Sequence, residues 1–159
     1  MKKMTAHPLW QRWQAWRHPG MVCVLLAGKL WAADLKEGRF LRTASVPLEE
    51  MTENAVAAAF RALAEQGMKR KEILLLVNFP DLRLENRKYP AMTEEEMVET
   101  MYWEEDRLFR TEEPMAPGWE VTSHSPLGWE VHVEAVKKET LSLWEKGAAL
   151  AGCHVGQAL

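Results

Sequence analysis

A chain of 159 residues with a formal net charge of -3 can form one domain or two small subdomains, and its balanced charge gives no general attraction to nucleic acid. The two cysteines are far apart in apolar sequence, which excludes a disulfide framework and indicates buried thiols in a reducing compartment. No run reaches the roughly 18 apolar residues of a transmembrane helix, and residues 1–20 lack the apolar core of a signal peptide, so we expect a cytoplasmic protein.

Residues 1–20 form a basic, Trp-rich N-terminal extension. They carry four basic residues and no acidic residue, namely Lys2, Lys3, Arg12 and Arg17. Trp10, Trp13 and Trp16 recur at a three-residue step, as on one side of a short amphipathic helix bordered by Arg17. Such a segment is typical of a membrane interface. The alternative is an extension that folds its tryptophans onto the protein's own surface, and the sequence leaves both interpretations open.

Residues 21–80 predict a β-β-β-α-β unit. The first strand is a continuous apolar run, and two further strands follow across short turns, at 21–27, 30–36 and 39–48. A helix opened by Thr52 or Glu53 ends at Gln66. Residues 73–77 are consecutive branched aliphatics, a pattern typical of a central parallel strand that is covered on both faces.

Residues 81–159 predict a strand, a helix and a hairpin, followed by a helix and a last strand. The expected elements are a half-solvated strand at 81–89, an acidic helix from residue 93, hairpin strands at 119–124 and 129–136, a helix at 138–151 and a strand at 153–159. The loop before the hairpin is rich in proline and glycine. The complete pattern is β-α-β-β followed by α-β.

The acidic helix has the most informative sequence. Thr93 is a typical N-cap, and Glu96 is its capping-box partner. An apolar arc follows along one side of the helix, made of Met97, Val98, Met101, Tyr102, Leu108 and Phe109. Glu105 projects into this arc, whereas Trp103 projects from the opposite, charged side. Either Glu105 reaches solvent at the edge of the arc and Trp103 lies against a neighbouring segment, or the helix contacts a second subdomain or a partner.

The order of the elements and several segments resemble the family of the type IV pilus assembly protein PilM, which is actin-like and related to the cell-division protein FtsA. The similar segments keep the family's order and spacing, at 44–48, 73–80, 89–97, 102–104, 129–137 and 148–152. The resemblance covers residues 21–159 and implies a mixed α/β (α+β) fold. It implies a partial actin-like lobe (β-β-β-α-β … α-β) at 21–80 and 137–159, with an inserted strand-helix-strand-strand (SHS2-like) subdomain at 81–136.

The resemblance also implies a function. Family members are cytoplasmic scaffolds at the inner membrane that capture the N-terminal tail of a bitopic, PilN-like partner. We therefore expect a non-catalytic adaptor of a type IV pilus or related type II secretion platform, with no nucleic-acid partner. The expected partner-binding residues are Tyr89, Trp103, Glu104, Glu105 and Trp129. Peripheral contact with the inner membrane would follow if the N-terminal extension binds lipid.

One departure from the family concerns the nucleotide. Actin-like sites open with an Asp-x-Gly-Ser/Thr hairpin, in which glycine admits phosphate to backbone N–H groups and the acid organises magnesium. This chain has Val24, Leu25 and Leu26 at that place, and it ends before the second lobe that would clamp the adenosine. We expect no cofactor and no enzymatic activity. The alternatives are half of a nucleotide-dependent actin-like ATPase completed by a separate chain, and an orphan protein-interaction domain.

Patterns for other chemistry are weak. His124 and His132 lie on adjacent predicted strands without a third ligand, so no metal site is expected. Glu104, Glu105 and Asp106 are consecutive and point in different directions from a helix, which argues against a catalytic carboxylate pair. The sequence contains no Walker motif and no dinucleotide fingerprint.

Overall fold

The computed structural model describes residues 20–37, 39–69, 71–76, 78, 80–104, 107 and 112–158. The described chain divides into two compact units, which we call the split unit (residues 20–80 and 139–158) and the inserted unit (residues 81–138). The predicted N-terminal Trp segment, with Trp10, Trp13, Trp16 and Arg17, lies outside the described residues, and so does Glu105. Among the described residues, no helix is long and apolar enough to cross a bilayer.

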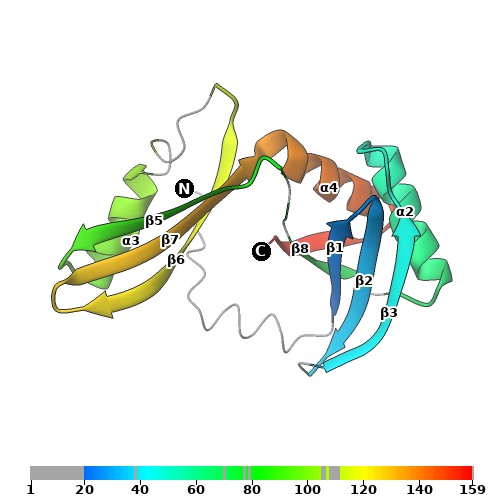
Figure 1. Ribbon diagram of the computed structural model, residues 1–159, viewed down its shortest axis with the longest axis horizontal. Coiled ribbons are helices and arrows are strands. Elements are labelled where there is room, and N and C mark those ends of the chain that lie inside the picture. The colour runs from blue at the N-terminus through cyan, green and yellow to red at the C-terminus, as the bar shows by residue number, and fades with distance from the viewer. Residues whose placement is uncertain are drawn as a thin grey trace. The chain divides into compact units, whose positions relative to one another are not determined.

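A five-stranded mixed sheet forms the centre of the split unit (Figure 1). Its strands are β1 (Gly20–Leu26), β2 (Lys29–Lys36), β3 (Arg39–Pro47), β4 (Glu72–Leu76) and β8 (His154–Ala158), in the order β3-β2-β1-β4-β8. The first three strands are antiparallel neighbours, whereas β4 pairs in parallel with both β1 and β8. The hairpin from β1 to β2 turns at Ala27 and Gly28, which both have positive φ, as a two-residue turn matched to the strand twist requires.

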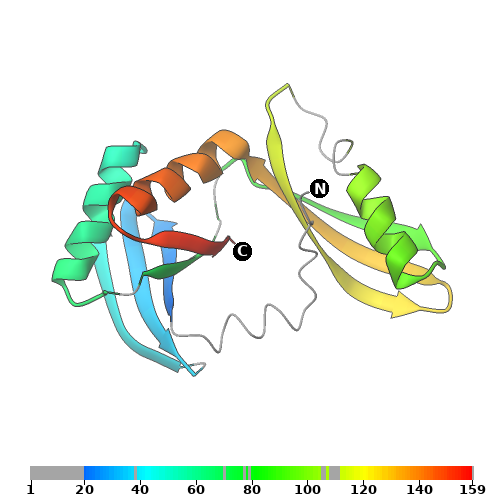
Figure 2. The same ribbon diagram turned by 180° about the vertical axis from the view of Figure 1, so that it is seen from behind.

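Two helices of the split unit, α2 (Glu53–Glu65) and α4 (Lys138–Leu150), lie side by side (Figures 1 and 2). Thr52 Oγ1 accepts a 3.1 Å hydrogen bond from Ala55 N, which confirms Thr52 as the N-cap of α2. The fully buried rings of Phe60 and Trp144 meet edge to face, with centroids 6.2 Å apart. Strand β4, which follows α2 in sequence, is buried at three of its five positions, as its aliphatic run predicts.

The inserted unit is a three-stranded antiparallel sheet with one helix. Its elements are β5 (Arg83–Pro90), α3 (Glu94–Glu104), β6 (Met115–Ser125) and β7 (Gly128–Lys137), and the strand order is β5-β7-β6. The chain enters and leaves this unit at one place, because Asp81 Oδ2 accepts a 3.1 Å hydrogen bond from Lys137 N. The tight turn at residues 126–127 joins β6 to β7, as the predicted hairpin requires.

The fold class is confirmed as mixed α/β, with a five-stranded mixed sheet and a separate three-stranded sheet. One boundary was wrong. Pro117 and Gly118, which the sequence places in a loop, belong to β6. An edge strand tolerates proline, because its missing N–H removes no ladder bond on the open side. Cys23 is buried, and burial raises the pKa of its thiol well above the ordinary value, as expected of an inert structural cysteine.

Candidate functional site

The inner face of the inserted sheet is the one that α3 covers. Side chains alternate along β7, so Trp129, Val131 and Val133 point to α3. These three residues form a buried cluster with Met97 and Met101 of the helix. The predicted apolar side of the acidic helix is therefore its packing side.

The start of α3 follows the sequence prediction. Thr93 N donates a 2.8 Å hydrogen bond to Glu96 Oε2, and Glu96 N donates a 3.2 Å hydrogen bond to Thr93 Oγ1. These reciprocal bonds are the predicted capping box, and they fix where the helix begins. Glu104 lies seven residues after Met97, on the same stripe of the helix. The stripe that faces the sheet therefore ends in a carboxylate.

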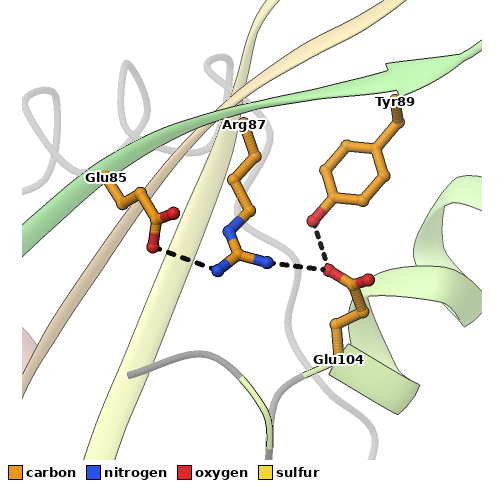
Figure 3. Close-up of polar contacts among 4 residues, drawn as sticks. All are labelled: Glu85, Arg87, Tyr89 and Glu104. Atoms are coloured by element: carbon orange, nitrogen blue, oxygen red, sulfur yellow. Dashed lines mark hydrogen bonds and ion pairs between the residues drawn. The ribbon is translucent and has the colours of Figure 1, made fainter. Parts of the chain in front are cut away.

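That carboxylate, of Glu104, belongs to a polar cluster of four side chains (Figure 3). Glu85, Arg87 and Tyr89 alternate along β5, and their register opposite Val133, Val131 and Trp129 places them on the inner face. Tyr89 Oη donates a 2.6 Å hydrogen bond to Glu104 Oε2, and Arg87 Nη1 lies 3.5 Å from the same oxygen. Arg87 Nη2 donates a 3.1 Å hydrogen bond to Glu85 Oε2. The cluster joins the end of α3 to strand β5.

The charges of this cluster are largely paired within it. Its two carboxylates and one guanidinium leave one negative charge. The hydrogen bond to Glu85 is the largest cause that raises the pKa of Arg87. Burial, and then the hydrogen bond to Glu104, raise the pKa of Tyr89 to about 12. Tyr89 is therefore a neutral donor to Glu104, whose carboxylate also lies beside the Arg87 guanidinium.

An exposed aromatic pair lies on the helix beside the cluster. Trp103 is 69% exposed, and Tyr102 is 52% exposed. Their rings meet edge to face, with centroids 5.8 Å apart. The prediction for Trp103 agrees with its position on the charged side, but Tyr102 was wrongly assigned to the buried arc. The buried side of the helix is narrower than the predicted apolar arc. Of the arc's residues, only Met97 and Met101 are buried in α3.

The other predicted partner-binding residues have different environments. Tyr89 and Glu104 belong to the polar cluster, whereas Trp129 is only 7% exposed and donates a 3.0 Å hydrogen bond from Nε1 to Met92 O. His124 stacks on the Trp129 ring, with centroids 3.7 Å apart. The indole of Trp129 is therefore a core group of the inserted unit, and its role in partner binding stays a prediction.

The prediction of a half-solvated strand at 81–89 did not single out Glu85 and Arg87, which face α3. Lys88 points to the opposite face of the sheet, where it pairs with Glu130 at 2.8 Å. The alternation of Glu85, Arg87 and Tyr89 was the available signal, because residues two apart share a face.

The two histidines considered for a metal are separated. His124 shares the inner face with Trp129, while His132 points to the opposite face, where its Nδ1 lies 2.8 Å from Asn86 Oδ1. A β-bulge between Val121 and Ser123 sets this difference. Within the described parts of the chain, no group of three or more His, Cys, Asp or Glu side chains could hold a metal ion.

Comparison with known proteins identifies the fold. No protein-family model and no curated protein matches the chain. Among solved structures, a PilM–PilN type IV pilus biogenesis complex is similar with a TM-score of 0.71 and 17% identity, over 88% of this chain and 46% of that chain. The cytoplasmic domain of EpsL, an inner-membrane component of the type II secretion system of Vibrio cholerae, is similar with a TM-score of 0.56 and 16% identity, over 89% of this chain and 57% of that chain.

A third solved structure is a Bacteroides thetaiotaomicron protein described as having an actin-like ATPase fold and unknown function, with a TM-score of 0.46 and 9% identity. This chain spans about half the length of the PilM and EpsL chains that it matches. At these identities the likeness shows the fold.

Proposed function

We propose that this chain is a non-catalytic scaffold of a type IV pilus or related type II secretion assembly platform. In this role it would work on the cytoplasmic side of the inner membrane and bind the N-terminal tail of a bitopic partner resembling PilN. The observation that carries the proposal is the similarity, over 88% of this chain, to PilM in a structure solved with PilN. Similarity to the cytoplasmic domain of EpsL, an inner-membrane secretion component, supports the same setting.

The surface at the end of α3 suits a short peptide. Trp103 and Tyr102 offer exposed aromatic area, and aromatic residues are the usual anchors of protein interfaces. The same helix carries four exposed glutamates and no basic residue, namely Glu94, Glu95, Glu96 and Glu99. A tail that combines apolar and basic residues would complement both features.

The polar cluster would hold the end of α3, and with it this surface, in a fixed position on β5. Glu104 follows Trp103 directly and is fixed on β5 by Tyr89 and Arg87. A helix end that is already ordered loses less conformational entropy when a peptide binds. In the proposal, Tyr102 and Trp103 contact the partner, and Tyr89 and Glu104 position them. Glu105 stays a predicted contact outside the described residues.

The test uses a synthetic peptide with the N-terminal cytoplasmic sequence of the PilN-like protein from the same cell. Calorimetric titration of the full chain should show saturable binding. Trp103→Ala should raise the Kd about 30-fold or more, equivalent to ~2 kcal/mol. Leu127→Ala is the matched control, because Leu127 is an apolar residue of the same unit and is 91% exposed at the hairpin tip.

The possible outcomes test the proposed adaptor role and the proposed binding surface at Trp103 separately. Absence of binding by the wild-type chain would contradict the proposed partner. Binding that is equally strong in wild type and Trp103→Ala would retain the adaptor role and contradict the site. A thermal melt of each variant checks folding, and both melting temperatures should stay near that of wild type, since both side chains are exposed.

A further inference from the structure

The end of the hairpin formed by β2 and β3 carries two exposed apolar side chains. Phe40 and Leu41 are each 58% exposed, and every residue at 39–43 of β3 is exposed. Gly20, the first residue of β1, pairs with Leu35, so this end of the hairpin extends past the start of β1 (Figure 1). Strand β3 is also an edge of its sheet, where only β2 pairs with it among the described residues. Phe40 and Leu41 therefore lie at an uncovered corner of the sheet.

Basic side chains surround these apolar residues. Residues 36–42 contain Lys36, Arg39 and Arg42 against one acidic residue. Lys36 and Arg39 are exposed, and 57% of the Arg42 side chain is exposed although its Nε lies 3.7 Å from Asp34 Oδ2. The corner therefore combines apolar area with positive charge that faces solvent. We call it the hairpin patch, and it consists of Lys36, Arg39, Phe40, Leu41 and Arg42.

The edge of β3 is poorly suited to pairing with another strand. A β-bulge in β3 places Leu41 and Arg42 together opposite Asp34. Bulges and basic side chains are features by which edge strands avoid pairing with a further strand. Gln66 Nε2 donates a 3.4 Å hydrogen bond to Ser45 O, and so occupies one backbone carbonyl of β3. A partner that adds a strand to this edge is therefore disfavoured, which leaves the exposed apolar side chains to be explained.

A lipid surface complements both kinds of side chain in the patch. Apolar residues enter the boundary between the headgroups and the acyl chains. Lysine and arginine keep their charge beside anionic headgroups while their aliphatic stems contact apolar groups. A bilayer also needs no matching shape, because a corner that extends from a sheet can contact it directly.

We propose that the hairpin patch binds an anionic lipid surface. In this arrangement Phe40 and Leu41 enter the headgroup region, and the three basic side chains lie beside lipid phosphates. The inference is independent of the adaptor role, because the patch belongs to the split unit whereas the proposed peptide contacts belong to α3 of the inserted unit.

Cosedimentation of the full chain with lipid vesicles tests the proposal. Vesicles of phosphatidylcholine are compared with vesicles that also contain phosphatidylglycerol. We expect binding to the anionic vesicles to be at least about tenfold tighter, because each basic residue near an anionic surface adds to the affinity. Added salt should weaken this binding by screening the charges.

Two double variants locate the lipid contact. Lys36→Gln/Arg39→Gln should weaken binding to the anionic vesicles about tenfold or more, since it removes two of the three basic side chains. Phe40→Ser/Leu41→Ser should weaken it by a similar factor of about ten, since it removes the apolar groups that enter the bilayer. All four side chains are exposed, so the melting temperatures should stay near that of wild type.

Matched controls come from the inserted unit. Arg83→Gln/Lys138→Gln removes the same charge from two exposed positions. Leu84→Ser/Leu127→Ser removes two apolar side chains that are 59% and 91% exposed. Both control variants should bind the anionic vesicles as wild type does.

Three results would overturn the proposal. Absence of wild-type binding to the anionic vesicles would do so in favour of an acidic protein surface as the partner of the patch. Binding that is equally strong in wild type and in both patch variants would assign the lipid contact to another part of the chain. Equal loss in the patch variants and their controls would show that binding follows total charge and apolar content rather than this corner.

Discussion

Tyr89 on β5 and Glu104 at the end of α3 are joined by a 2.6 Å hydrogen bond, although 15 residues separate them in sequence. Glu104 continues the stripe of Met97 and Met101 that faces the sheet, so a carboxylate ends the packing side of the helix. Arg87 compensates the charge of the Glu104 carboxylate, because its guanidinium nitrogen Nη1 lies 3.5 Å from the same oxygen. The helix is thus held by apolar packing along its length and by polar contacts at its C-terminal end.

Tyr89→Phe should lower the free energy of unfolding by about 1 kcal/mol, because it removes a hydrogen bond to a charged acceptor and keeps the ring. Denaturant unfolding measures the change. Tyr102→Phe is the matched control at the only other tyrosine, which is exposed, and it should change stability by less than ~0.5 kcal/mol. Equal effects of the two substitutions would mean that the Tyr89 bond does not stabilise the unit.

The phenol of Tyr89 should titrate with a pKa of about 12, raised from its ordinary value of 10.0 mainly by burial and then by Glu104. The raised pKa favours the neutral phenol in the folded state. Its contribution to stability is therefore complete below pH ~10 and is lost as the pH rises toward about 12. Phenolate absorbance of wild type minus that of Tyr89→Phe isolates this residue, and a midpoint near 10 in the folded protein would disagree.

Gly147→Ala should destabilise the split unit, although alanine is the better helix former. A Cβ at Gly147 would lie 2.5 Å from Val56 Cγ1 and 3.1 Å from Glu53 O, so α2 and α4 would have to separate. Overpacking of this kind costs about 1–3 kcal/mol, against a propensity gain of about 1 kcal/mol. Thermal and denaturant unfolding measure the net loss.

A second substitution tests that explanation. In a Val56→Gly background, Gly147→Ala should cost much less, because the Cγ1 and the Cβ of Val56, which lie 2.5 Å and 2.6 Å from the position of the new methyl group, are both absent. If the cost is the same in both backgrounds, contact with the Val56 side chain is not its cause.

ATP with magnesium should not bind at millimolar concentration. The β1–β2 hairpin carries Val24, Leu25 and Leu26 where an actin-like site requires an acid and a glycine. Calorimetry should show no saturable heat. A Kd below ~0.1 mM, equivalent to more than 5 kcal/mol, would contradict the prediction and favour the nucleotide-dependent alternative.

The sequence alone determined the features that depend on neighbouring residues. The reciprocal bonds of Thr93 and Glu96, and the cap at Thr52, involve groups within three positions of one another. The apolar runs of β1 and β4 and the short turns between strands are local in the same sense. For this reason the number, type and order of the described elements could be predicted, apart from boundaries such as the start of β6 at Met115.

Only the tertiary structure decided which residues meet. Strand β5 pairs with β7 rather than with its sequence neighbour β6, and this register turns Glu85 and Arg87 toward α3. The bulge after Val121 sends His124 and His132 to opposite faces, and the narrow contact of α3 with the sheet leaves Tyr102 exposed. Side-chain periodicity shows which residues share a face, but the element that covers the face depends on pairing between distant segments, and local sequence does not encode that pairing.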